Sequence, residues 1–109
     1  MTSRAPSSLL ALLIFLGLYG VPAQSQDQSW RETKCTLYQH AVIDALGMLG
    51  QDGIRKEFLA ENDAFIASGC IDNYRICPQT DRETELANLL TIMTMNEGMA
   101  STFVPFGCP

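Results

Sequence analysis

Apolar and polar residues alternate with the 3.6-residue period of an α-helix in three stretches of the chain. The first stretch follows the sequence SWRE at positions 29–32, a capping box in which a serine hydroxyl and a glutamate carboxylate satisfy backbone N–H groups of the first helical turn. Its apolar stripe consists of Cys35, Tyr38, Val42, Ala45, Leu46 and Leu49. Gly50 and the pair Asp52-Gly53 predict that this helix ends there.

The second stretch, residues 54–68, places three large apolar side chains on one face. These are Ile54, Phe58 and Phe65, and a glycine follows the stretch in a position that suits a left-handed C-cap. The polar pair at positions 62–63 interrupts the pattern. A continuous helix is therefore predicted, with a break near the polar pair as the alternative.

The third stretch begins at a second capping box, TDRE at positions 80–83, and ends near Gly98. One apolar stripe contains Leu86, Leu89, Leu90 and Met93, and a second stripe of Ile92, Met95 and Met99 lies on a different side. The last ten residues contain a proline and lack a regular alternation, so we expect an extended tail over the helices. These patterns predict an all-α fold: a small three-helix bundle, stapled by disulfides, with an extended C-terminal tail.

The N-terminal residues have the layout of a cleaved secretory signal peptide. Arg4 precedes LLALLIFLGLYG, an apolar run that falls short of the roughly 20 residues of a transmembrane helix. Small residues follow this run, so we expect a signal peptide at 1–23, cleaved after Ala23, with cleavage after Ser25 as an alternative. A short segment at 24–28 then precedes a single helical domain at 29–109.

Acidic residues outnumber basic ones in this chain. The formal net charge is −5, and removal of Arg4 with the signal peptide leaves six basic residues against twelve acidic ones, a net charge of −6. Such a surface repels phosphate backbones and anionic lipid headgroups. We therefore expect no nucleic-acid partner and no stable membrane insertion.

The four cysteines of a secreted chain indicate two disulfide bonds. A short connection makes the first two helices antiparallel and brings Cys35 beside Cys70. The tail is long enough to return Cys108 to Cys77 at the start of the third helix. We predict Cys35–Cys70 and Cys77–Cys108, both at one end of the bundle. The alternatives are Cys35–Cys77 with Cys70–Cys108, and a local Cys70–Cys77 bond with Cys35–Cys108.

Candidate chemistry is sparse in this sequence. The cysteines lack the spacing of a structural zinc site and His40 is the only histidine, so we expect no metal and no other cofactor. His40 and Asp44 share a helix face, which suits general-base work but also describes an ordinary surface pair. We expect no catalytic residue and no enzyme. The dibasic pair at 55–56 has the form of a prohormone cleavage site, but its place in a helical pattern favours an uncleaved pair.

The C-terminal third carries more apolar surface than one helix stripe needs. We expect Ile92, Met95, Met99, Phe103 and Phe106 to form a surface for an extracellular protein partner or receptor, or for a second copy in a homodimer. The alternative is that the tail covers the second stripe and completes the core. The first function hypothesis is a secreted signalling, toxin-like or pheromone-like factor. The second is an extracellular carrier of a small hydrophobic ligand bound between the helices and the tail.

Overall fold

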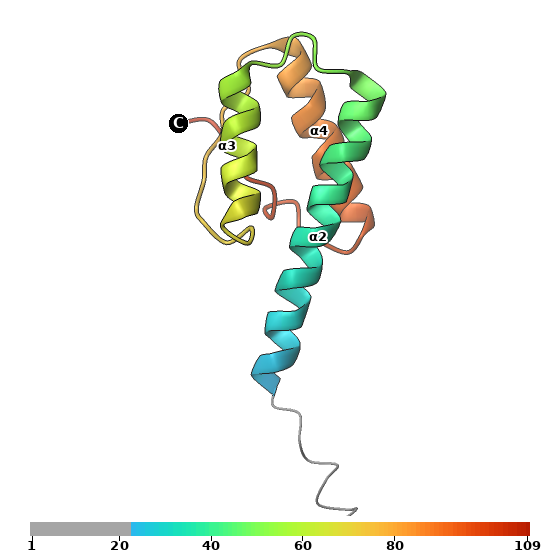
Figure 1. The fold of residues 1–109 in the computed structure, drawn as a ribbon, viewed down its shortest axis with the longest axis vertical. Coiled ribbons are helices and arrows are strands. Elements are labelled where there is room, and N and C mark those ends of the chain that lie inside the picture. The colour runs from blue at the N-terminus through green and yellow to red at the C-terminus, as the bar shows by residue number, and fades with distance from the viewer. Residues whose placement is uncertain (1–22) are drawn as a thin grey trace, which may run out of the picture.

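Three helices stand side by side in the computed structural model, which describes the backbone of residues 23–109 and the side chains of residues 28–109. They are α2 (Ala23–Leu49), α3 (Lys56–Ala67) and α4 (Asp81–Asn96), and an irregular tail follows them (Figure 1). The predicted small all-α bundle is confirmed. The signal peptide predicted at 1–23 lies outside the described residues, except for its last residue.

Helix α2 begins well before the predicted start at Ser29. The backbone carbonyl of Ser29 accepts a hydrogen bond from the Thr33 hydroxyl at 2.9 Å within the helix, so the predicted N-cap at this residue is wrong. Residues 23–28 contain neither glycine nor proline, and nothing in them stops a helix. The segment expected ahead of the domain is therefore helical, and the first turns of α2 project beyond α3 and α4 (Figure 1).

The other helix ends follow the local signals of the sequence. Gly50 and Gly69 have φ angles of 75° and 83°, which glycine adopts without strain at the end of a helix. At the start of α4, the Thr80 hydroxyl accepts a hydrogen bond from the Glu83 backbone N–H at 3.0 Å, as the capping box predicts. The Glu83 carboxylate does not complete the box, because it accepts hydrogen bonds from the backbone N–H groups of Gln79 and Arg55 instead.

Helix α3 is continuous across the polar pair at 62–63, so the alternative of a helix break is wrong. Asn62 is only 3% exposed, and its side-chain oxygen accepts a hydrogen bond from the Tyr38 hydroxyl of α2. Burial raises the pKa of Tyr38, which keeps this donor protonated. The helix starts at Lys56 rather than at Ile54, whose buried side chain packs in front of the first turn.

The chain crosses the whole bundle between α3 and α4. Residues 70–80 run along the outside of α3 to the corner that joins α2 and α3 (Figure 1), where the Thr80 hydroxyl donates to the Gly53 carbonyl at 2.5 Å. An extended stretch of this length spans up to ~33 Å, more than the ~18 Å of a twelve-residue helix. Helix α4 therefore starts at this corner and runs antiparallel to α2. The prediction that α4 starts beside Cys35 and Cys70 is wrong.

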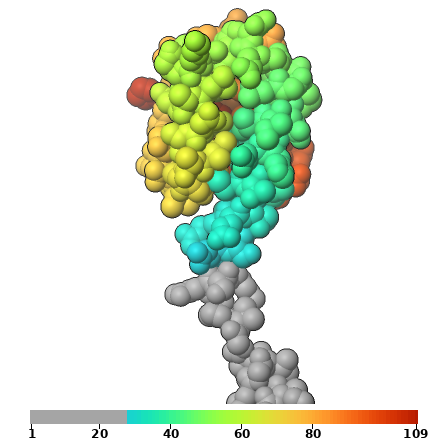
Figure 2. Space-filling view, in the orientation of Figure 1, coloured from blue at the N-terminus to red at the C-terminus, as the bar shows by residue number. Residues whose placement is uncertain are grey.

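The core lies between the three helices and includes the tail. Tyr38 at its centre makes edge-to-face contacts with Phe65 and Phe103, at centroid distances of 5.5 and 5.9 Å. Other buried members are Ala41, Val42, Ala45, Ile54, Phe58, Cys70, Ile76, Leu86, Leu90 and Val104. On the face shown in Figure 2, the side chains of α2 and α3 meet over this core. Three non-helical segments thus supply core residues alongside the helices: the α2–α3 corner, the segment between α3 and α4, and the tail.

Candidate functional site

Two disulfide bonds tie the non-helical segments to the bundle. Cys35 is bonded to Cys70 and Cys77 to Cys108, which is the predicted pairing. The first bond lies beside the end of α3, where the Cys35 sulfur is 3.7 Å from the Ile66 carbonyl oxygen. The second lies toward the start of α3, because the Cys77 carbonyl is 3.5 Å from the guanidinium of α3's N-cap residue. The two bonds therefore lie toward opposite ends of α3. The prediction that both lie at one end of the bundle is wrong.

The residues predicted to form one partner surface lie in different environments. Ile92 and Met95 are 57% and 50% exposed on α4. Met99 is buried, and Phe103 is half-buried in the aromatic cluster of the core. Phe106 stacks on Phe58 of α3 with a centroid distance of 5.6 Å. The tail therefore completes the core with part of the predicted surface, while the two α4 side chains remain uncovered.

A half-open groove of about 570 Å³ separates residues 70–75 from residues 101–106. Aromatic side chains on its lining are Phe65, Tyr74, Phe103 and Phe106, and polar ones include Asp72, Asn73, Arg75, Ser101 and Thr102. Beyond the groove the two segments meet in a parallel bridge between Ile76 and Phe106. There the Ile76 N–H donates to the Pro105 carbonyl at 2.8 Å, and the Gly107 N–H donates to the Ile76 carbonyl at 3.0 Å. The bridge and the Cys77–Cys108 bond close one end of the groove.

A cation lies against one aromatic wall of the groove. The ammonium group of Lys34 on α2 is 5.4 Å from the ring centroid of Phe103 and 5.9 Å from that of Trp30. Trp30 is 44% exposed on the projecting part of α2. Two rings therefore hold the Lys34 charge close to the groove through cation–π attraction.

The strongest electrostatic contact lies at the far corner of the bundle. The carboxylate of Glu83 is fully buried and accepts hydrogen bonds from the Arg55 guanidinium at 2.8 and 2.9 Å and from the Arg55 backbone N–H at 2.8 Å. The Gln79 backbone N–H adds a further bond at 2.9 Å. Burial alone would raise the pKa of Glu83, but these hydrogen bonds outweigh it and lower the pKa to about 2. This pair joins the start of α3 to the start of α4, and neither residue lines the groove.

The remaining candidate chemistry lies apart from the groove. His40 and Asp44 are both exposed on α2. Within residues 28–109, no three histidine, cysteine, aspartate or glutamate side chains gather as ligands for a metal ion. None of the described helices combines the length and apolar character needed to cross a membrane.

Comparison of the chain with protein-family models, with curated proteins and with solved structures finds no match. The groove, its charges and its aromatic walls are therefore the features from which a function is argued.

Sequence patterns missed the groove because its walls are two non-helical segments far apart in the chain. Residues 70–75 and 101–106 have no periodicity that points to a partner, and only the tertiary fold brings them together. One signal was available: Tyr74, Phe103 and Phe106 are aromatic residues outside the helices, in a chain with nine aromatic residues of the kinds Phe, Trp and Tyr. Aromatic residues in irregular segments either enter the core or contact a ligand. Here they pack on the core and also line the groove.

Proposed function

We propose that this protein is a small secreted factor that acts by binding an extracellular protein partner, without catalysis. The proposal rests on the half-open groove between residues 70–75 and 101–106. Cys70 fixes one wall to α2, and the Cys77–Cys108 bond joins the two walls beyond the groove. A groove whose walls are held in place before binding loses less conformational entropy when a partner docks.

Secretion is supported by two independent features of the chain. Two disulfide bonds are typical of proteins from oxidising compartments. The apolar run and small residues at the N-terminus have the pattern of a secretory signal. Both features support an extracellular site of action.

A carrier of a small hydrophobic ligand is the second candidate. The groove's volume of about 570 Å³ falls within the roughly 300–1,000 Å³ of small-molecule sites. The groove is half-open, however, and polar residues as well as aromatic ones line it. A wholly apolar ligand would leave those polar groups without hydrogen-bond partners, so the lining favours a protein partner.

The test is a screen of the oxidised protein against an array of extracellular protein domains, followed by affinity measurements on two variants. Thr102→Trp places an indole on the exposed groove wall, and Met95→Lys changes an exposed α4 residue outside the lining. We expect saturable binding to at least one domain, its loss in Thr102→Trp and its retention in Met95→Lys. Failure to bind any domain, or loss of binding in Met95→Lys alone, would contradict the proposed groove.

Titration with a fluorescent apolar probe separates the two candidates. A carrier binds one probe molecule per chain, saturably and in competition with other apolar ligands. The protein-binding factor gives no saturable probe signal, because its groove exposes polar groups to the ligand.

A further inference from the structure

The basic side chains of this acidic protein are unevenly distributed. Residues 28–109 contain six lysine and arginine residues, of which Arg55 and Arg82 form salt bridges with Glu83 and Glu85, each at 2.8 Å. Arg75 lies on the groove lining, and Lys34 lies against the Phe103 ring that forms part of it. The cations left without a carboxylate in the described part of the chain therefore include two at the groove.

Arg75 is exposed beside the tail at the closed end of the groove. A Cβ atom on Gly107 would lie 3.0 Å from the Arg75 Nη1, so the guanidinium packs closely on the tail backbone there. Lys34 is held by the Trp30 and Phe103 rings on the other side. Lys34 is thus held by two aromatic rings, and Arg75 is an exposed cation beside the tail.

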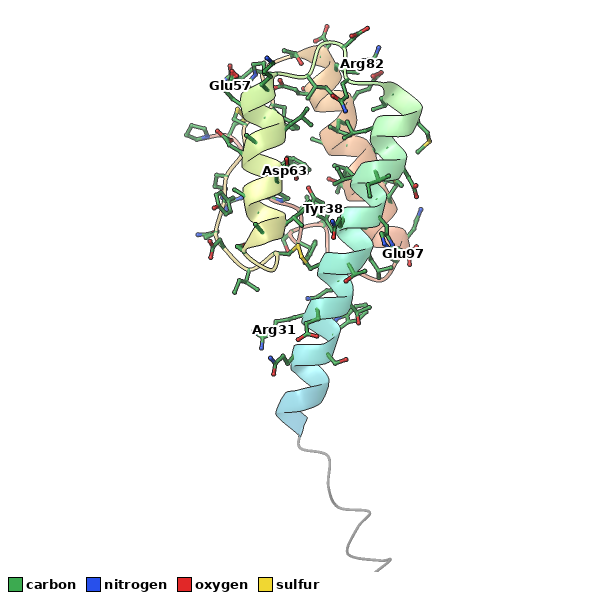
Figure 3. All side chains as sticks on the ribbon, in the orientation of Figure 1. Arg31, Tyr38, Glu57, Asp63, Arg82 and Glu97 are labelled. Carbon is green, nitrogen blue, oxygen red and sulfur yellow. A yellow bond between two sulfur atoms is a disulfide. The ribbon has the colours of Figure 1, made fainter. Side chains whose placement is uncertain are left out.

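Two cations, Arg75 and Lys34, lie at the groove against one carboxylate. Asp72 is the one carboxylate on the lining, and it offsets Arg75. Lys34, beside the Phe103 ring, adds a positive charge. Arg31 lies one turn earlier in α2 and extends from the side of the helix that faces α3 in Figure 3, outside the groove lining. The secreted chain as a whole would carry a net charge of −6. An anionic group would therefore find attraction at the groove and repulsion over most of the remaining surface.

We propose that the groove binds an extended peptide segment of the partner that carries a carboxylate beside an aromatic or aliphatic side chain. This inference rests on the proposed function and names the part of the partner that the groove receives. The apolar side chain packs on the rings of Phe103 and Phe106, and peptide amides meet polar residues such as Thr102. The carboxylate pairs with Lys34 or Arg75. The walls are irregular chain with turns at residues 72–74 and 100–103, and they pair in a strand-like bridge between Ile76 and Phe106 at the closed end of the groove. A segment that continues this pairing would be extended.

The experiment pans the oxidised protein against a display library of random linear peptides and measures the Kd of the enriched peptides after synthesis. We expect these peptides to share an aspartate or glutamate close to an aromatic or aliphatic residue. Lys34→Glu and Arg75→Glu should each weaken binding about tenfold or more, because each change replaces attraction by repulsion at a screened distance. Added salt should weaken binding by the unmodified protein as well.

Lys56→Glu is the matched control, because Lys56 is an exposed cation at the start of α3, outside the groove lining, and the substitution makes the same change in net charge. It should leave the Kd unchanged, and thermal unfolding should show that all three variants remain folded. Equal weakening in Lys56→Glu, or enriched peptides that lack carboxylates, would overturn the inference.

Two further outcomes would also overturn this inference. One is a library that yields no enriched peptide. The other is groove-dependent binding to phosphatidylserine vesicles without peptide binding, which would make a membrane the occupant. Neither outcome decides the proposed function, because loss of partner-domain binding in Thr102→Trp tests the groove with a folded partner.

Discussion

The carboxylate of Glu83 receives hydrogen bonds from two backbone N–H groups and from the guanidinium of Arg55, and none of its surface is exposed. A buried charge is costly unless charged and polar partners replace the water it loses. Here the partners come from the α2–α3 corner and from the segment before α4. A single side chain therefore joins three parts of the chain that the helix patterns treat separately.

Glu83→Gln should lower the free energy of unfolding by about 2–3 kcal/mol, because an amide leaves the Arg55 guanidinium without its counter-charge. Urea unfolding followed by circular dichroism measures this change. Glu85→Gln is the matched control, since the Arg82–Glu85 pair is exposed and such pairs contribute less than about 1 kcal/mol. Equal losses of unfolding free energy in the two variants would show that the buried pair stabilises the fold no more than the exposed pair does.

The same residue predicts how stability depends on pH. The folded state lowers the pKa of Glu83 from 4.5 to about 2, so the unfolded chain takes up this proton first as the pH falls. The stabilisation is complete above pH 4.5 and should be lost progressively as the pH falls toward 2. Urea midpoints measured over this range should fall more steeply for the unmodified protein than for Glu83→Gln. Parallel curves would contradict the assignment.

At the scale of elements, the helices are largely specified by local signals and the tail is specified by packing. The Thr80 cap, the glycine C-caps and the apolar stripes predicted the three helices, because each depends on residues within a few positions. The predicted start of α2 at Ser29 was wrong, because residues 23–28 contain no glycine or proline and the helix continues through them. The tail follows no period, and its aromatic contacts with Tyr38 and Phe58 hold it on the bundle.

Removing the Cys77–Cys108 bond tests how the tail is held. The double substitution Cys77→Ser with Cys108→Ser should cost about 3–4 kcal/mol, since the bond spans a sequence separation of 31 residues. The helices should remain, because the tail still packs Val104 and Phe106 on the core. Amide hydrogen exchange at Ile76 and Gly107, the donors of the tail bridge, should accelerate more than exchange within α2. Uniform acceleration at every amide would contradict a locally anchored tail.

At the scale of the whole molecule, the cysteine pairing was predicted and the path of the chain between its cysteines was not. The pairing follows from reach: the tail is long enough to return to Cys77 wherever α4 begins. The location of α4 depends on contacts such as Arg55 with Glu83 and Gly53 with Thr80, which join residues more than 25 positions apart. The groove between residues 70–75 and 101–106 is a consequence of this path. A reading of local patterns therefore gave the helices and the bonds, but not the candidate site.

Both walls of the proposed site depend on the disulfide pairing, so a disulfide map is the most direct test. Trypsin cuts after Lys34, Arg55, Lys56, Arg75 and Arg82, which places each cysteine on its own peptide. With free thiols blocked, mass spectrometry of the oxidised protein should show peptide 35–55 bonded to peptide 57–75 and peptide 76–82 bonded to peptide 83–109. A bond between peptides 57–75 and 76–82, or free thiols in the purified protein, would contradict the fold and the groove together.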